Sequence, residues 1–533
     1  MSSAIHIQHL RHCTHLRGGD TLAARQRIDH ALAEMLDEGL EAALLHAGVD
    51  SDEEICIRRL HTLTQLDLSR SDLQLTADWS IAWINDLRGA LLSGGDNVVR
   101  YRSQLHLLMD MATRVLRGDE SRAWAWRQLG FWSGIAPTAP QAQIELVCVL
   151  VRHPTAVMPV CTVLAQQSAL GGWMATLPHT ELRRLVTAAL QAANTNPTVL
   201  SQHEDEAFSM SVVNDEWMAR ASQLIATSPL HRELAPIVTA ANAVDIAALV
   251  VLAAEPTAIR GFDDTRRLLD VSKVLLYVSK HKSDSFSPRI GEQDGGDGNF
   301  VSRPATTQSQ ELLPPRSSHV PITSATYSSV TINELGTTPN TSTLALPRDA
   351  GEGMSSQPEA STASAGQHAH TEFGGLMYLL WLIEPSGVLD AVTSESPFAL
   401  RGLRCALRQM ARQLLPLEED DPILNVFAGL PPLQSPQQAL IDAPITPAEA
   451  ADITVLTNRL VALLRERLRE PTIVRERVLD VVCRRSADIH FDPGWIELHF
   501  KLDAASIAIR RSGLDRDPGW LSWLGAVVRF AYV

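Results

Sequence analysis

Residues 513–533 have the sequence GLDRDPGWLSWLGAVVRFAYV, in which two tryptophans precede a β-rich hydrophobic septet. The last residues of most chains are polar and frayed. A hydrophobic segment of this kind, left free, would pair with other chains and aggregate. We therefore predict that this tail is buried, either in the fold or against a partner.

A small sheet is predicted around this tail. Residues 471–533 contain four stretches with strand patterns, at 488–491, 495–500, 506–510 and 527–533. The first two flank Asp492-Pro493-Gly494, whose residue types favour a hairpin turn. Asp-Pro-Gly-Trp recurs at 517–520, which indicates that the same turn chemistry is used twice.

Upstream of this sheet, residues 372–470 have helical patterns. The sequence FGGLMYLLWLI at 373–383 is apolar on nearly every side, which predicts a buried helix. Amphipathic patterns at 397–415 and 447–469 predict two more helices, separated by a proline-rich stretch.

The composition changes abruptly between residues 283 and 371, where Ser, Thr, Pro, Gly and Gln dominate and apolar residues are isolated. Such a segment cannot bury enough apolar surface to offset an ordering cost of about 1–2 kcal/mol per residue. We predict a disordered linker.

Residues 1–96 alternate between strand and helix patterns. Strands are predicted at 5–12 and 55–68. The apolar stripe of the first helix consists of Ile28, Leu32, Met35, Leu36, Leu40 and Leu44. The second helix is predicted to begin at Asp78, to end at Gly94-Gly95 and to carry Trp79, Trp83, Leu87 and Leu91. This order predicts a compact α+β unit.

Residues 97–282 are helical almost throughout, in segments punctuated by prolines, as in a bundle of helical hairpins. The predicted fold class is therefore mainly α with small β elements. Because isolated hairpins are only marginally stable in water, we expect the β regions of 1–96 and 471–533 to pair into one sheet across the linker.

The composition is that of a soluble globular protein, with 45% hydrophobic and 20% charged residues. A formal charge of −15 disfavours binding to nucleic acid or to anionic membranes. Six scattered cysteines without a CxxC pair indicate free thiols in a reducing compartment. No secretory signal pattern is present, and no run reaches the roughly 18 apolar residues that span a bilayer. We expect a cytoplasmic protein without membrane insertion.

Motifs for catalysis and cofactors are missing from the sequence. None of the four lysines follows a glycine, so there is no P-loop, and no Gly-x-Ser-x-Gly elbow occurs. Histidines at 6, 9, 12 and 15 recur every third residue beside Cys13. This spacing places alternate residues on opposite faces of a strand, which favours ordinary strand histidines over a zinc site. We predict no catalytic residue, no cofactor and no metal.

Two sets of side chains are candidates for partner binding. Arg401, Arg404, Arg408 and Arg412 form a stripe at helical spacing, which is either a docking face for an acidic partner or the solvated side of an amphipathic helix. Tryptophans are used both in cores and at binding hot spots, and both readings stay open. The candidate partner-binding residues are Trp495, Trp520, Trp523, Phe530, Arg404, Arg408 and Arg412.

Four stretches also carry a family resemblance. They are residues 31–68, residues 118–130 (GDESRAWAWRQLG), FGGLMYLL at 373–380 with Asp421-Pro422 and 428–430 downstream, and residues 513–524. These stretches resemble a bacterial protein family found with contractile injection systems, phage-tail-like particles that drive a tube through a membrane. Members of this family are commonly called tape-measure proteins.

The resemblance implies a non-enzymatic structural or assembly component of an injection particle. Its implied partners are the tube, the baseplate or the assembly ATPase, and the chain would stay in the cytoplasm or be incorporated into a released particle. A length ruler should be an extended helix rising about 1.5 Å per residue. The 29 prolines and the β-rich tail favour a compact assembly factor instead. The alternative is a cytoplasmic helical adaptor or regulatory binding module unrelated to any particle.

Overall fold

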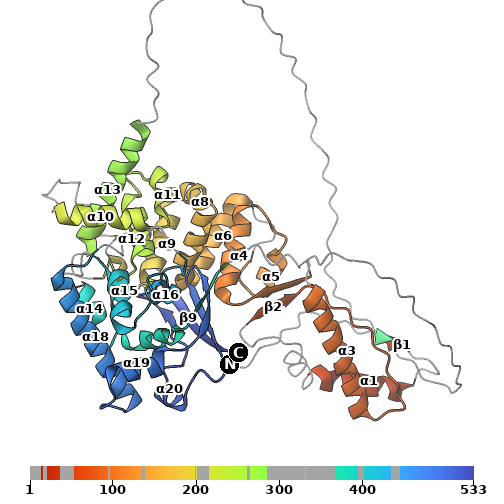
Figure 1. Cartoon of the computed structure of the whole chain (residues 1–533). Helices are drawn as coiled ribbons and strands as arrows, with labels where there is room; N and C mark the ends of the chain where they lie inside the picture. The colour runs from red at the N-terminus through yellow and green to blue at the C-terminus, as the bar shows by residue number, and fades with distance from the viewer. Residues whose placement is uncertain are drawn as a thin grey trace, which may run out of the picture. The chain divides into compact units, whose positions relative to one another are not determined.

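The computed structural model describes residues 14–15, 21–36, 53–93, 97–133, 138–198, 200, 215–260, 264–284, 330–331, 366–393, 401–433 and 444–533. These residues are mainly helical with small sheets, which confirms the predicted fold class (Figure 1). The chain forms two compact units. The first comprises Met1–Arg100 with Ser283–Pro358, and the second comprises Tyr101–Lys282 with Glu359–Val533.

The described residues of the first unit form two helices and four short strands. They are β1 (Thr14–His15), α1 (Leu22–Glu34), β2 (Glu54–Ile57), α3 (Asp72–Ser93), β3 (Val98–Tyr101) and β4 (Val330–Thr331). β1 pairs with β4 and β2 pairs with β3. α1 packs on α3 around buried Ile28, Met35 and Trp79. Arg27 ties the two helices together, because its guanidinium donates to Asp72 Oδ1 and to the Leu68 carbonyl, each at 2.7 Å.

Several predictions for this unit need correction. The second helix begins at Asp72, six residues earlier than predicted, because Ser71 and Gln74 exchange side-chain to backbone hydrogen bonds at its start. The second strand ends at Ile57 and not near Leu68, since its partner β3 is only four residues long. The predicted strand at 5–12, and Leu40 and Leu44 of the first apolar stripe, lie outside the described residues.

The first part of the second unit is a bundle of short helices. They are α4 (Gln104–Leu116), α5 (Ala123–Gln128), α6 (Ala139–Arg152), η2 (Pro154–Ala156), α7 (Val157–Gln166), α8 (Leu170–Thr176), α9 (His179–Ala192), α10 (Asp215–Thr227), α11 (His231–Leu234), η4 (Ala235–Ile237), α12 (Ala243–Ala254) and α13 (Asp264–Asp284). This confirms the predicted helical pattern, apart from the missed strand β3. An ion pair of 2.6 Å between Arg183 Nε of α9 and the fully buried Asp245 of α12 links two of the helices.

No single helix among the described residues is long and apolar enough to cross a bilayer. One pair passes the same test of length and composition together, Ala139–Arg152 followed by Pro154–Gln166. The two members of this pair are bent by 113° relative to each other.

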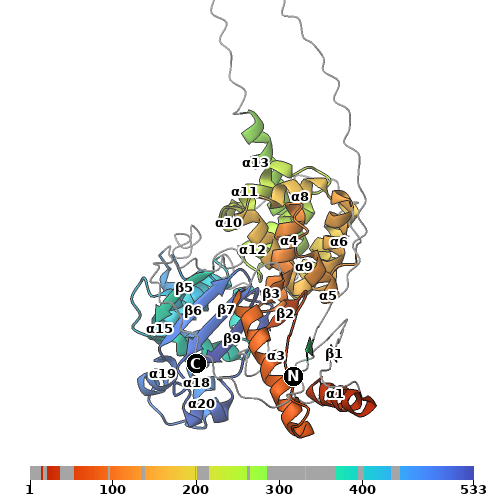
Figure 2. The ribbon, with the colours of Figure 1, turned by 90° about the vertical axis from the view of Figure 1, so that its right-hand side faces the viewer.

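The second part of this unit combines one sheet with the helices that cover it. Its elements are β5 (Gln367–Thr371), η5 (Gly374–Leu382), α14 (Val388–Thr393), α15 (Leu403–Leu414), α16 (Pro422–Phe427), α18 (Pro447–Leu468), α19 (Arg475–Cys483), β6 (Ala487–Asp492), β7 (Trp495–Phe500), α20 (Ile507–Ser512), β8 (Gly519–Leu521) and β9 (Ala526–Tyr532). The strand order is β5-β6-β7-β9-β8, and Figure 2 shows β5, β6, β7 and β9 of this sheet. β7 and β9 are parallel, and the other neighbours are antiparallel.

The hydrophobic tail lies inside this sheet, which confirms the prediction that it is buried. β9 lies between β7 and β8. Its inward side chains Ala526, Val528 and Phe530 are at most 7% exposed and belong to the main core of the second unit. The hydroxyl groups of Tyr532 and Tyr378 are hydrogen-bonded at 3.0 Å, which connects the tail to η5.

The predicted hairpin is also confirmed, whereas the second Asp-Pro-Gly-Trp motif runs directly into strand β8 and forms no such turn. β6 and β7 pair in register around the first Asp-Pro-Gly-Trp motif. Gly494 has φ +74° and Gly519 has φ +70°. Both motifs therefore place their glycine in the left-handed region, which other residues adopt only at a cost.

Two predictions for the second part are wrong. Residues 506–510 were expected to be a strand, but Ile507–Ser512 forms helix α20, which ends at Gly513 with φ +70°. An alternation this short fits a single helical turn as well as a strand. Residues 367–371, placed in the predicted linker, form strand β5. The buried helix predicted at 373–383 is confirmed, and it is a 3-10 helix over Gly374–Leu382.

The expected pairing of the two terminal β regions is not found among the described residues. The C-terminal sheet takes its extra strand from β5, and β2 pairs with β3 instead. The compact units also differ from the five predicted segments, because residues 101–282, 366–470 and 471–533 share one unit. The remainder of the predicted linker, apart from the end of α13 and β4, lies outside the described residues.

Candidate functional site

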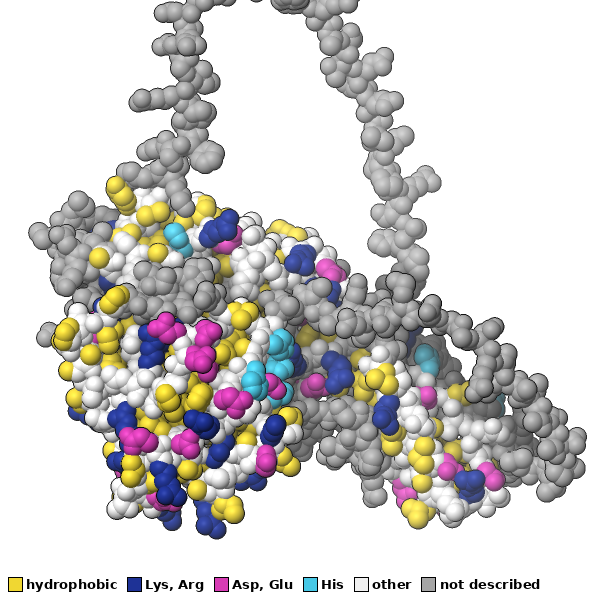
Figure 3. Space-filling view, viewed as in Figure 1, with side chains coloured by type: hydrophobic (Ala, Val, Ile, Leu, Met, Phe, Trp, Pro, Cys, Tyr) yellow, Lys and Arg dark blue, Asp and Glu magenta, His cyan; other side chains and the backbone are white. Residues whose placement is uncertain are grey.

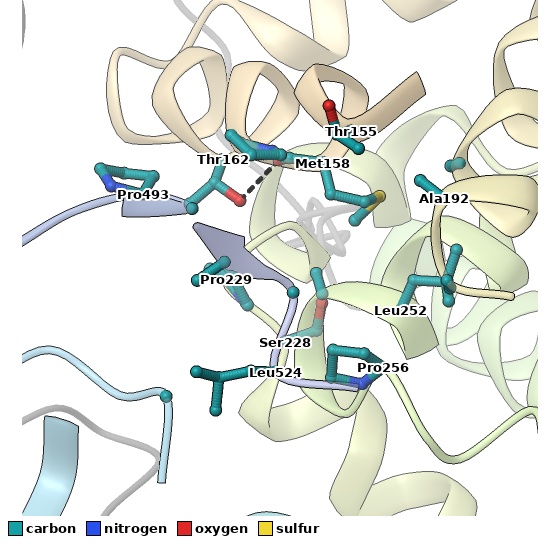
Figure 4. Close-up of a pocket in the computed structure, with 18 of the residues that line it drawn as sticks. Thr155, Met158, Thr162, Ala192, Ser228, Pro229, Leu252, Pro256, Pro493 and Leu524 are labelled. Carbon is teal, nitrogen blue, oxygen red and sulfur yellow. Dashed lines mark hydrogen bonds between the residues drawn. The ribbon is translucent and has the colours of Figure 1, made fainter. Parts of the chain in front are cut away.

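A cleft of about 430 Å³ lies between the helical bundle and the C-terminal sheet of the second unit. This volume falls within the range of about 300–1,000 Å³ that ligand pockets occupy. Figure 4 shows Met158 and Leu252 on the helical side, and Pro493 and Leu524 on strands and turns of the C-terminal part. Six prolines from separate segments line it, namely Pro154, Pro159, Pro229, Pro256, Pro431 and Pro493. The walls are therefore rigid and mostly apolar.

The two Asp-Pro-Gly-Trp motifs place the C-terminal wall of the cleft. At the first turn, a Cβ on Gly494 would lie 2.2 Å from Pro159 Cγ, so only glycine allows this approach to α7. At the second, Trp520 Nε1 donates to the Ala192 carbonyl at the end of α9, at 3.2 Å. The two motifs thus fix the sheet to the bundle at two points.

Polar side chains of the cleft are largely occupied within the protein. Ser522 Oγ accepts hydrogen bonds from Arg260 Nη2 at 2.6 Å and from Asn194 Nδ2 at 2.9 Å. The hydroxyl of Thr162 donates to the Met158 carbonyl at 2.9 Å (Figure 4). The hydroxyl of Thr227 donates to the Gln223 carbonyl at 3.0 Å. These groups hold the walls together and leave little capacity for a ligand.

Arg404 at the start of α15 is different. Its side chain lines the cleft, and its buried Nε has no hydrogen-bond partner among the described residues. Burial lowers the pKa of Arg404, and the negative charge of Glu255 offsets part of this effect. An arginine nonetheless keeps its charge in proteins. The cleft therefore contains a cation in a mainly apolar setting.

Glu255, the carboxylate whose charge acts on Arg404, already accepts hydrogen bonds within the protein. Its side chain is only 3% exposed. The Thr257 hydroxyl donates to Glu255 Oε1 at 2.8 Å, and the backbone N–H of Arg404 donates to Oε2 at 3.2 Å. The negative charge of Glu255 also acts on the buried Arg220. Burial lowers the pKa of the Arg220 guanidinium too. One carboxylate thus serves two arginines.

Histidines gather on the outer face of the C-terminal sheet. His368 of β5 and His490 of β6 are direct cross-strand neighbours with ring centroids 4.3 Å apart. His490 also stacks on His499 of β7, again at 4.3 Å. Figure 3 shows histidine side chains close to arginine and acidic side chains on this surface. No group of three or more His, Cys, Asp or Glu side chains has the arrangement of a metal site within the described part of the chain.

Acidification is expected to lower the stability of the protein through His490. Burial lowers the pKa of His490 below 6.5, and His499, His368 and Arg102 lower it further, against an opposing effect of Glu497. Between the lowered folded pKa and 6.5 the unfolded chain binds more protons, so stability falls as the pH drops through this window. His490→Gln is expected to reduce the loss of melting temperature between about pH 7 and pH 5, measured by thermal unfolding.

His370→Gln serves as the matched control with the opposite sign. Hydrogen bonds to Asp488 at 2.7 Å and to Glu372 at 3.3 Å raise the pKa of His370. Its stabilisation is complete below 6.5 and is lost as the pH rises through the raised folded pKa. Replacing His370 should therefore enlarge the loss of melting temperature between about pH 7 and pH 5. If both variants shift the pH dependence in the same direction, this account of the face is wrong.

The cleft brings together two of the seven predicted partner-binding residues, Trp520 and Arg404. Trp523 and Phe530 lie in the core at 2% and 7% exposure. Trp495 is 6% exposed and packs against His106 of α4, with ring centroids 5.3 Å apart. Of the two alternatives for the tryptophans, core and binding site, Trp523 and Trp495 are therefore core residues.

The predicted arginine stripe is not one surface. Arg408 is 1% exposed and its guanidinium donates to Asn425 Oδ1 of α16, so a solvated or docking role at this position is wrong. Arg401 pairs with Glu449 at 2.6 Å. Arg412 lies 4.0 Å from Glu419. α15 is covered by its neighbours on both sides, which a spacing pattern along one helix cannot reveal.

Sequence reasoning missed the cleft prolines and the histidine face. The prolines appeared only as breaks between helices, and nothing in their spacing shows that they converge. Part of the histidine face could be inferred from the sequence. His490 and His499 lie on the two strands of the predicted hairpin, at positions that share one face of the sheet. Its third member, His368, lay in the segment predicted to be a linker.

Comparisons with known proteins found no match for this chain among protein-family models, curated proteins or solved structures.

Proposed function

We propose that this chain is a non-enzymatic structural or assembly component of a bacterial contractile injection system that holds a neighbouring subunit in the proline-lined cleft. Its partners in this proposal are tube, baseplate or assembly-ATPase subunits. Membership of the particle rests on the sequence resemblance described above. The holding role rests on the cleft.

The observation that carries this proposal is how the resembling stretches pack. A Cβ on Gly429 would lie 2.7 Å from Leu524, which brings the stretches around 428–430 and 513–524 into direct contact. Trp381 Nε1, one residue beyond the stretch at 373–380, donates to the Arg516 carbonyl at 3.0 Å. Residues that carry the resemblance are thus turn and core residues that build a scaffold, and Leu524 also lines the cleft.

Purification of injection particles tests the proposal. A tagged full-length chain is expressed in a bacterium that makes contractile particles, and the particles are isolated by sedimentation. We expect the chain to co-sediment with tube or baseplate subunits and its deletion to reduce particle yield. Recovery of soluble regulatory partners alone would favour the adaptor alternative.

Measuring the length of the tube distinguishes a length ruler from a compact assembly factor. Shortening the segment between Asp284 and Gly366 should shorten the tube if the chain is a ruler. The compact second unit favours an unchanged tube length, which electron microscopy of the particles can measure.

A further inference from the structure

Helix α3 of the first unit has apolar side chains on two opposite sides, and one of these sides is exposed. Leu75 and Trp79 are buried where α3 packs on α1. On the other side, Leu73, Ile81 and Leu92 are 79%, 56% and 81% exposed. A helix that is apolar on both sides is normally covered on both, so the exposed side indicates an interaction surface.

The side chains of this second side form one stripe, which we call the α3 stripe. Its six members are Leu73, Ala77, Ile81, Ile84, Arg88 and Leu92. Because successive residues of a helix advance by about 100°, these six positions fall within an arc of about 100°. Ile84 is half-buried, and the other five are exposed. The stripe extends along nearly all of α3, which has 22 residues.

The spacing of the α3 stripe is the same in both chain directions. Successive members are four, four, three, four and four residues apart. Two antiparallel copies of α3 therefore place Leu73 of each copy opposite Leu92 of the other. The same pairing places Ile81 of each copy opposite Ile84 of the other. Such reciprocal contacts are what a two-fold symmetric dimer requires.

The one charged member of the stripe favours the antiparallel direction. Arg88 of each copy then lies opposite Ala77 of the other, whose small side chain leaves room for the arginine. The next residue, Asp78, supplies a carboxylate beside this position, in addition to its ion pair of 2.8 Å with Arg70. A parallel pair would instead place Arg88 against Arg88, and like charges in contact are unfavourable.

We propose that this chain forms a two-fold symmetric dimer through antiparallel contact between the α3 stripes of two copies. Stable interfaces bury about 1,200–2,000 Å². One helix from each subunit lies at the small end of this range, so the dimer is weak and depends on concentration. This inference goes beyond the proposed function and does not rest on it.

Analytical ultracentrifugation of the full-length chain over a range of concentrations tests the dimer. The wild type should show an equilibrium between monomer and dimer. Ile81→Glu should weaken the dimer about tenfold or more, or 1.4 kcal/mol, because the symmetry places the new charge in the interface twice. Circular dichroism verifies that each variant is folded.

Leu22→Glu is the matched control for this substitution. Leu22 is 74% exposed, and it lies on α1 instead of the α3 stripe. The same change from an apolar side chain to a charged one should therefore leave the dissociation constant of the dimer unaltered.

Cross-linking with a short bismaleimide measures the direction of the two helices. Residues 73 and 92 lie near opposite ends of α3. In the antiparallel dimer, neither Leu73→Cys nor Leu92→Cys should cross-link to a second copy of the same variant. An equimolar mixture of the two variants should cross-link. The wild type measures the background from the native thiols.

Three results would overturn the inference: a chain that stays monomeric at every concentration, an equal effect of Ile81→Glu and Leu22→Glu, or cross-linking of Leu73→Cys to its own copies. A strictly monomeric chain would mean that the α3 stripe is covered within the chain or by a different subunit. Co-sedimentation with particles is measured separately, so the loss of this inference leaves the proposed function standing.

Discussion

Deletion of residues 526–533 is expected to abolish the cooperative unfolding transition of the second unit. The deletion removes β9, which pairs with β7 on one side and β8 on the other. It exposes the core that Val528 and Phe530 fill, at about 1.5–3 kcal/mol for each buried side chain of this size. It also leaves β7 with an unpaired edge and β8 without a partner. The summed loss is comparable with a typical domain stability of about 5–15 kcal/mol.

The measurement is thermal unfolding followed by circular dichroism, with size-exclusion chromatography to detect aggregation. Val533→Ala is the matched control, because the Val533 side chain is 76% exposed and the substitution keeps the backbone bonds to Phe500 and Leu502. It should change the melting temperature little. A deletion variant that stays monomeric and melts like the wild type would show that the tail is not an integral packing element.

The position of this tail shows what the sequence could predict. Its β-rich, hydrophobic composition predicted a buried strand, because composition is a local property. Its place between β7 and β8 depends on a parallel pairing with β7, through a connection that includes α20 and β8. Such a connection involves contacts between distant residues that no local pattern encodes.

β5 is a strand that could not be predicted from its own sequence. Gln367–Thr371 follows a long polar stretch, so its composition indicated a linker. It becomes a strand because β6 offers an open edge, with which it pairs over five residues. A strand stabilised by its neighbour cannot be recognised from its own sequence, since strand preference depends strongly on context.

The candidate site was predictable only in part. Trp520 and Arg404 were singled out for their residue types, and the structure places both in the cleft. Arg408 has the same residue type and the same helical spacing, yet it lies in the core against Asn425. Residue type thus identifies candidates, whereas the packing of α15 against α16 and α18 decides which of them reach a surface.

Gly375→Ala is the point substitution expected to destabilise the protein most. Gly375 lies in η5, and α19 packs against η5 closely. An added Cβ would lie 2.2 Å from the Val482 carbonyl oxygen and 3.1 Å from Cys483 Cα. Both are backbone atoms of the end of α19, so the contact cannot be relieved by a rotamer change. The whole helix must move, and α19 carries buried Val478 and Val482 in the same core.

Overpacking of a core usually costs about 1–3 kcal/mol and occasionally more. We expect Gly375→Ala to reach or exceed the upper end of this range, because the contact is with backbone. Gly172→Ala is the matched control. Gly172 lies in α8, where an added Cβ meets no atom within 4 Å and the backbone has an ordinary helical φ. Alanine there should stabilise the protein by about 0.4–1 kcal/mol, through the unfolded state and its higher helix propensity.

Urea unfolding of the two variants and the wild type measures this difference directly. The two substitutions add the same methyl group, so any contrast between them reports the surroundings of the glycine and not the chemistry of the change. Because η5 approaches α19 closely, the urea concentration at the unfolding midpoint should fall for Gly375→Ala. For Gly172→Ala it should rise slightly. Equal midpoints would mean that η5 can move away from α19 at little cost. The consecutive glycines at 374 and 375 would then have no packing role in a stretch that also carries the family resemblance.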